Sequence, residues 1–144
     1  MPIIETFELT RKYGSFIAVE GLNLTVEAGE VLGFLGPNGA GKTTTIRMLA
    51  GMIAPTSGYA VINGLRTDGP VEKLHEVTGL LTESPGFYNR LSARRNLEYF
   101  AGFYPGIDAR VQTEKYLRLM GLQERSLAPA GSFSKGMKQR LALA

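Results

Sequence analysis

Apolar and polar residues alternate over several short stretches in the first half of the chain. Such alternation is typical of strands with one buried face, whereas a short unbroken apolar run is typical of a strand buried on both faces of a parallel sheet. The second pattern occurs at residues 31–35, after a turn at residues 28–30. The predicted strands are residues 3–9, 22–26, 31–35, 58–62 and 77–81, and Asn63-Gly64 predicts a turn after the fourth.

Helical periodicity replaces strand alternation late in the chain. One earlier helix is expected over residues 42–52, ended by Gly51 and Pro55. Ser92 is placed to cap a helix with one apolar face, made of Leu97, Phe100, Ala101 and Tyr104. Asp108 is placed to cap the next helix, which should end near Met120-Gly121. The final stretch, SFSKGMKQRLALA, opens with small polar residues and continues with helix formers, which predicts a helix start suited to an anion.

Strands therefore dominate the first part and helices the last. At 144 residues the chain is long enough for one domain with a core of its own. The composition changes near residue 85, and we expect a subdomain boundary there: residues 1–84 would be rich in β-structure and residues 85–144 helical. No apolar run reaches the length of a membrane span, and no signal sequence opens the chain.

A glycine-rich loop with phosphate-binding chemistry lies between the predicted strand at 31–35 and the helix at 42–52. The loop fits the pattern G-x-x-x-x-G-K-[ST] without a mismatch. Its glycines let consecutive backbone N–H groups converge on phosphate oxygens, the lysine reaches the β- and γ-phosphates, and the first threonine hydroxyl is placed to bind Mg²⁺. A glycine-rich turn with an incidental lysine is the alternative that this context disfavours. The residues are Gly36, Pro37, Asn38, Gly39, Ala40, Gly41, Lys42 and Thr43, with Thr44 as a further phosphate contact.

The cysteine content and the charge distribution disfavour two classes of function, cysteine chemistry and nucleic-acid binding. The chain has no cysteine, which excludes disulfides, thiolate metal sites and thiol nucleophiles. Residues 1–72 hold five basic and seven acidic residues, while residues 73–144 hold eleven and six, for a net charge of +3. The basic residues are dispersed among acidic and apolar ones without a nucleic-acid-binding signature, so we expect no nucleic-acid partner.

Three motifs in order, GPNGAGKTT, LAGMIAPTSGYAVINGL and SFSKGMKQRLALA, resemble the nucleotide-binding domain of an ABC transporter. The resemblance covers essentially the whole chain. It implies an α/β fold, the phosphate-loop NTPase core of an ABC ATPase, with an N-terminal antiparallel β subdomain and the start of a helical subdomain. It also implies ATP and Mg²⁺ as ligands and an ATPase activity in the complete protein.

The resemblance assigns roles to residues outside the phosphate loop. Tyr13 takes the place of the aromatic residue that stacks on adenine, and Val19 that of an apolar residue beside the base; a half-buried surface aromatic is the alternative for Tyr13. Glu83 occupies the position of the Q-loop glutamine, where a carboxylate would still bind Mg²⁺; the alternative is a solvated loop glutamate. His75 is the one histidine of the chain. It lies too early in the sequence to be the family's switch histidine, and we expect it at the surface.

Residues 133–137 stand where the family signature commonly reads L-S-G-G-Q. Ser134 and Gly136 are kept, whereas Lys135 replaces a glycine and Met137 the glutamine, a variant that resembles an exporter branch. In the family this helix start closes over the ATP of a second ATP-binding domain. The implied partners are thus a homodimeric or heterodimeric second domain and transmembrane permease subunits, and the implied location is cytoplasmic and peripheral to the inner face of the cell membrane.

After residue 144 the family pattern would continue into a buried strand that supplies an aspartate, a catalytic glutamate and later a histidine. We therefore expect a truncated form of a longer protein, inactive alone, in which the strand at 31–35 has an edge that must be covered. The leading interpretation is the ATP-binding subunit of an ABC exporter. Two alternatives stay open: a naturally short, non-catalytic nucleotide-binding module, and a soluble ABC-type ATPase without a transporter.

Overall fold

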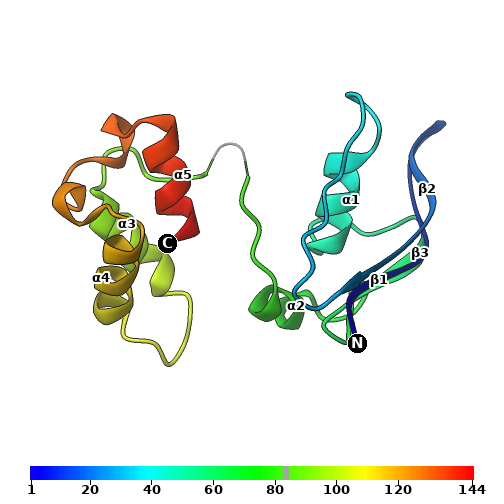
Figure 1. Cartoon of the computed structure of the whole chain (residues 1–144), viewed down its shortest axis with the longest axis horizontal. Helices are drawn as coiled ribbons and strands as arrows, with labels where there is room; N and C mark the ends of the chain where they lie inside the picture. Colours follow the sequence, from blue (N-terminus) through cyan, green and yellow to red (C-terminus); the bar gives the residue numbers. More distant parts are fainter. Residues whose placement is uncertain (83–84) are drawn as a thin grey trace. The chain divides into compact units, whose positions relative to one another are not determined.

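The chain forms two compact units, Met1–Leu80 and Leu81–Ala144, in a computed structural model that describes residues 1–82 and 85–144. The first unit contains a β-sheet and two helices, and the second contains helices (Figure 1). In chain order the elements are β1 (Pro2–Tyr13), β2 (Phe16–Glu27), α1 (Lys42–Leu49), β3 (Ser57–Ile62), β4 (Leu65–Arg66), α2 (Val71–Val77), α3 (Ala93–Ala101), α4 (Ala109–Leu119), the 3-10 turns η1 (Gln123–Arg125) and η2 (Ala130–Ser132), and α5 (Lys135–Leu143).

The sheet of the first unit is antiparallel throughout, in the order β2-β1-β3-β4. Strands β1 and β2 form a long hairpin whose tip pairs Tyr13 with Phe16. Three predicted strands are confirmed, and two of them extend well beyond the alternating residues. The turn at Asn63-Gly64 is also confirmed, because both residues have positive φ angles, 48° and 77°, as a tight hairpin turn requires.

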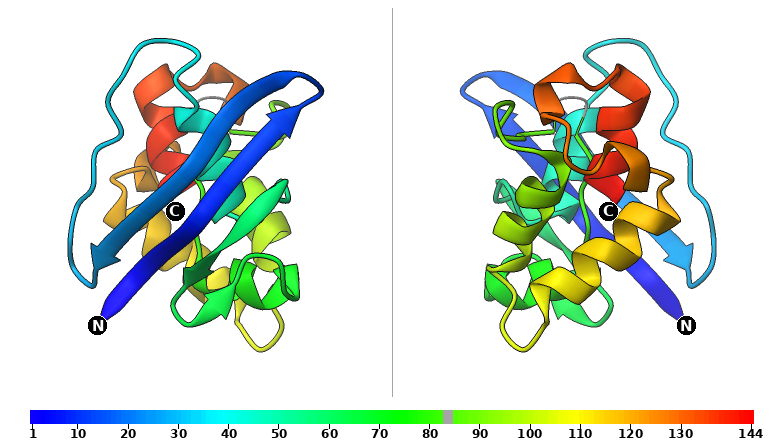
Figure 2. Two further views of the ribbon diagram at one scale, coloured as in Figure 1. Left: turned by 90° about the vertical axis from the view of Figure 1, so that its right-hand side faces the viewer. Right: turned by 90° about the vertical axis from the view of Figure 1, so that its left-hand side faces the viewer.

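Helix α1 lies against one face of this sheet (Figures 1 and 2). The contact buries Leu9 of β1, Met48 of α1 and Ala60 of β3 completely. The helix ends at Leu49, three residues before the predicted end, and Gly51 follows it with a φ of 69°. The sheet therefore supports the helix that follows the phosphate loop.

Two predicted strands are wrong. Residues 31–35 form no strand, and Val31 and Leu35 are 96% and 95% exposed. Residues 77–81 form no strand either: Val77 ends α2, a short helix that the sequence analysis missed, and residues 78–81 have no regular structure. A strand needs a neighbour for its backbone N–H and C=O groups. In residues 1–82 the two segments have no such neighbour, although each is apolar.

The second unit follows the predicted helical pattern. Ser92 caps α3 by accepting a hydrogen bond from the Arg95 N–H, and Asp108 caps α4 by accepting from the N–H groups of Arg110 and Val111. The core is formed by residues from α3, α4, α5 and the turns between them: Ala93, Leu117, Leu122, Ala130, Phe133 and Leu141. No helix in the described part of the chain has the length and apolar content needed to cross a membrane.

Candidate functional site

The phosphate loop, residues 36–43, is built on backbone angles that glycine adopts easily. Gly36, Gly39 and Gly41 have φ angles of 147°, 86° and 83°, in the range that other L-residues rarely occupy. The loop passes directly into α1, whose first-turn N–H groups have no intrahelical acceptor. The Thr45 N–H donates a helix-type hydrogen bond of 2.8 Å to the Gly41 carbonyl oxygen. The backbone N–H donors of the loop and the positive end of the α1 dipole thus meet at the start of α1.

Lys42 is held over the loop by the loop's own carbonyl groups. Its Nζ atom donates hydrogen bonds of 2.7 Å to the carbonyl oxygens of Gly36 and Pro37. An ammonium group has three donors, so one remains for a further acceptor. The positive charge is therefore fixed beside the loop amides, where a phosphate oxygen would meet both. The neighbouring Thr43 side chain is exposed at the first turn of α1.

Gly41 fits closely against strand β2. A Cβ atom at this position would lie 2.3 Å from the carbonyl oxygen of Ala18 and 3.0 Å from Cγ2 of Val19. Only a glycine allows this approach. Val19, which the sequence analysis placed beside the base, thus lies directly next to the C-terminal end of the phosphate loop. The contact with Ala18 was missed, because no spacing rule links residues so far apart in the chain.

Tyr13 lies at the tip of the β1–β2 hairpin, and its side chain is 46% exposed. The guanidinium of Arg11 stands over one face of its ring, 4.5 Å from the centroid, which is within cation–π range. Arg11 was also missed, although residues two apart in a strand share a face and the spacing alone pointed to it.

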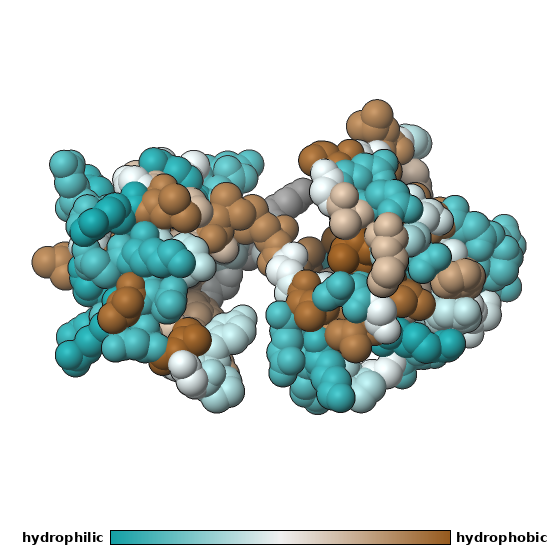
Figure 3. Space-filling view, turned by 60° about the horizontal axis from the view of Figure 1, so that its bottom comes forward, coloured by the Kyte–Doolittle hydropathy of each residue, from teal (hydrophilic) through white to brown (hydrophobic). Residues whose placement is uncertain are grey.

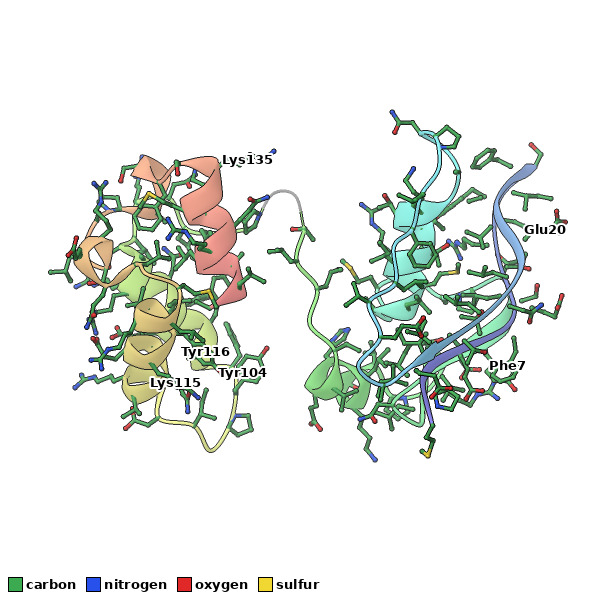
Figure 4. The ribbon with its side chains drawn as sticks, viewed as in Figure 1. Phe7, Glu20, Tyr104, Lys115, Tyr116 and Lys135 are labelled. Atoms are coloured by element: carbon green, nitrogen blue, oxygen red, sulfur yellow. The ribbon has the colours of Figure 1, made fainter. Side chains whose placement is uncertain are left out.

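The late signature segment opens helix α5 in the second unit. Ser134 is its N-cap and accepts a hydrogen bond of 3.3 Å from the Met137 N–H. Lys135 and Gly136 are exposed, and Figure 4 shows Lys135 at the N-terminal end of the helix. Met137 is half-buried and packs on the core of the unit. The helix start predicted from the sequence is confirmed, with its first residues facing solvent.

Glu83 and His75 are the two other residues named from the sequence. Glu83 lies outside the described residues. His75 is exposed, as expected, and its Nε2 is 3.2 Å from the Ala50 carbonyl oxygen, where it touches the end of α1.

Comparison with known proteins decides the family. The family model described as "ABC transporter" matches residues 19–144. The chain belongs to the ABC transporter family. The bacitracin transport ATP-binding protein BcrA of Bacillus licheniformis is 46% identical over 142 residues, which cover 99% of this chain and 46% of that protein. The probable multidrug ABC transporter ATP-binding protein YbhF of Escherichia coli is 39% identical over 145 residues, 99% of this chain and 25% of that protein.

Solved structures show the same fold. The structure of CbiO1 from Clostridium perfringens, part of an ABC transporter complex, matches with a TM-score of 0.85 at 25% identity and covers 99% of this chain and 59% of that one. An ATP-binding subunit of an ABC transporter matches with a TM-score of 0.84 at 30% identity, over 98% and 60% of the two chains. This ABC nucleotide-binding domain therefore has the predicted ABC ATPase fold, and it spans about half the length of BcrA.

Proposed function

We propose that the protein binds Mg-ATP as the ATP-binding subunit of an ABC transporter and, in its whole form, couples ATP hydrolysis to export. The observation that carries this proposal is the ammonium of Lys42, fixed by two loop carbonyls at the N-terminus of α1 with one donor left. The residues we assign to ATP are the phosphate loop, Thr44, Tyr13 and Val19.

Removal of the Lys42 charge tests the triphosphate site. Lys42→Ala should abolish Mg-ATP binding in calorimetry and leave the circular dichroism spectrum unchanged. Lys73→Ala removes an exposed lysine of α2 and is the matched control, which should bind as the unaltered chain does. Equal ATP affinity for the two variants would refute the assignment of Lys42.

The adenine site is tested separately. Tyr13→Ala should weaken ATP binding by about 1–3 kcal/mol, the range for base–aromatic stacking, but leave inorganic triphosphate binding unchanged. Phe16→Ala is the matched control, because Phe16 pairs with Tyr13 across the hairpin tip and is also exposed. Equal weakening of both ligands by Tyr13→Ala would remove this residue from the site.

The proposed Mg²⁺ site depends on the nucleotide. The described residues contain no group of three His, Cys, Asp or Glu side chains that could hold a metal ion. The Thr43 hydroxyl would therefore bind Mg²⁺ together with phosphate oxygens, with Glu83 as the further ligand that the family resemblance implies. Thr43→Val should reduce the effect of Mg²⁺ on ATP affinity and leave metal-free ATP binding unchanged.

The proposed partners are a second ATP-binding domain at Ser134–Met137 and membrane permease subunits, which would hold the protein at the cytoplasmic side of the membrane. An aromatic cluster in the second unit supports a protein partner. Its ring centroids are 5.1–6.4 Å apart, and four of its members are exposed, namely Tyr88, Tyr99, Phe100 and Phe103, while Phe87 is half-buried. Export rests on the signature variant and on the names of BcrA and YbhF. Deletion of the gene should raise cellular accumulation of the transported compound, with bacitracin the first to assay; lower accumulation would indicate import.

A further inference from the structure

Arg11 of strand β1 carries a polar atom that the fold leaves unpaired. Its Nε atom is buried and has no hydrogen-bond partner among the residues that the structure describes. Its guanidinium forms no ion pair with any residue in 1–82 or 85–144. Buried polar atoms are normally paired, because a donor without an acceptor destabilises the fold. Stability alone therefore does not explain why an arginine occupies this position.

The guanidinium of Arg11 connects two parts of the first unit. Its Nη1 atom donates a hydrogen bond of 2.8 Å to the carbonyl oxygen of Ala54. Its Cζ atom lies 4.5 Å from the centroid of the Tyr13 ring. Within the described part of the chain no other cation lies over this ring, and no other aromatic ring stacks on it. Arg11 is therefore the side chain placed to orient Tyr13.

The carbonyl group of Ala54 is a well-fixed acceptor, because its loop is bonded to β1 on both sides of Arg11. The Thr56 N–H donates a 2.8 Å hydrogen bond to the Thr10 carbonyl oxygen, and the Thr56 hydroxyl accepts one of 2.9 Å from the Lys12 N–H. The same loop follows helix α1, which begins at the phosphate loop. The guanidinium is thus held by the helix and strand that also support the phosphate loop.

Without Arg11, the exposed ring of Tyr13 would turn freely at the surface. Figure 3 shows apolar side chains scattered among polar ones over the visible face of the first unit, so an exposed ring is ordinary and only its orientation needs a cause. A freely turning side chain loses that freedom when a ligand stacks on it, and the loss weakens binding. A ring that a guanidinium already holds has less freedom to lose.

We propose that Arg11 is a positioning residue for the adenine base and acts through Tyr13, an inference that rests on the proposed role of Tyr13 in ATP binding. The Ala54 carbonyl holds the guanidinium, and the guanidinium holds the ring in the orientation that stacks on the base. A lysine cannot take this role, because one compact ammonium group cannot bond to the carbonyl and spread over the ring at the same time.

The test compares ATP with inorganic triphosphate by calorimetry on the whole chain. Arg11→Ala should weaken ATP binding about two- to fivefold, the loss that corresponds to an exposed cation–π contact, and leave inorganic triphosphate binding unchanged. Arg11→Lys keeps the charge without the guanidinium and should lose a similar amount. Lys12→Ala is the matched control: it removes an exposed charge from the next position, keeps the backbone bond to Thr56, and should bind both ligands as the unaltered chain does.

A double-mutant cycle separates a role through Tyr13 from a direct contact between Arg11 and the nucleotide. In the Tyr13→Ala background, Arg11→Ala should cause no further loss of ATP affinity, because the ring that it orients is gone. A loss that persists in that background, an equal loss for inorganic triphosphate, or full ATP affinity in Arg11→Lys would overturn the proposal. Full ATP affinity in Arg11→Ala, with Tyr13→Ala weakened, would overturn it and leave the adenine site standing, whereas unchanged ATP affinity in Tyr13→Ala would overturn both.

Discussion

Gly41 is the residue on which the shape of the phosphate loop depends most directly, and a single methyl group tests this. Gly41→Ala places a Cβ 2.3 Å from the Ala18 carbonyl oxygen, and the obstacle is backbone that belongs to strand β2. Gly39→Ala is the matched change: Gly39 has nearly the same φ, 86° against 83°, but a Cβ there has no atom within 4 Å.

The comparison separates the free-energy cost of the left-handed conformation from the cost of overpacking. A left-handed conformation costs a non-glycine residue about 1–2 kcal/mol, and both variants incur this. Overpacking adds about 1–3 kcal/mol, and only Gly41→Ala incurs it, because the Ala18 carbonyl is fixed in the sheet. We therefore expect Gly39→Ala to lower the unfolding free energy by about 1–2 kcal/mol and Gly41→Ala by about 2–5 kcal/mol.

Urea unfolding followed by circular dichroism measures this difference, provided that the slope of free energy against urea is the same for both variants. Calorimetry with Mg-ATP gives the second readout: Gly41→Ala should lose more nucleotide affinity than Gly39→Ala, since relief of the clash moves the start of α1 away from β2. Equal loss of stability would show that Gly41 does not pack on Ala18, and the account of the loop's position would fail.

Three further predictions concern the second unit. Asn96→Ala should cost about 1–3 kcal/mol in urea unfolding, because the side chain of Asn96 is fully buried and its amide oxygen accepts the hydrogen bond of the Tyr88 N–H, which would lose its acceptor. The carbonyls of Tyr88, Leu91 and Ser92, which accept from the Asn96 amide nitrogen, each keep a backbone N–H donor. Hydrogen bonds from Arg94 and, to a smaller extent, from Gln123 lower the pKa of Glu114 below its ordinary 4.5. The contribution of the Glu114 carboxylate to the unfolding free energy is therefore present above that pH and is lost as the pH falls through the lowered pKa. The difference in unfolding free energy between the unaltered chain and Glu114→Gln should shrink on acidification. Ser134→Ala should cost about 1 kcal/mol and increase amide exchange in the first turn of α5.

Local signals in the sequence were reliable guides. The caps at Ser92 and Asp108 are formed as expected, and so are the Asn63-Gly64 turn and the helix start in the final stretch, which Ser134 caps. Each of these features depends on residues within four positions along the chain, so a short window contains everything that determines it. The phosphate loop belongs to the same class, because its glycine φ angles and the Lys42 contacts arise within eight residues.

Non-local features were beyond the same reasoning. The apolar run at residues 31–35 specifies a segment suited to burial but not the strand that would pair with it. Helix α2 has one buried residue, Leu74, and too few turns to produce a periodic signal. Glu8 adopts a φ of 46° inside β1, and a Cβ on Gly58 of β3 would lie only 2.2 Å from its carbonyl. No pattern within β1 predicts this bend, because the close neighbour of Glu8 is Gly58 in another strand.

One hairpin positions both halves of the proposed nucleotide site. Strand β2 supplies Ala18 and Val19, which set the place of Gly41 and hence of the phosphate loop, while the tip of the β1–β2 hairpin carries Tyr13. Residues 31–35, which lead into the loop, pair with no strand in residues 1–82, so the loop takes its position from the sheet on its other side. The ladder contains register shifts close to Arg11, between the two contact points. We therefore predict that a substitution that displaces the backbone of that irregular stretch, which would move the aromatic ring relative to the loop, changes the affinities for ATP and for inorganic triphosphate together.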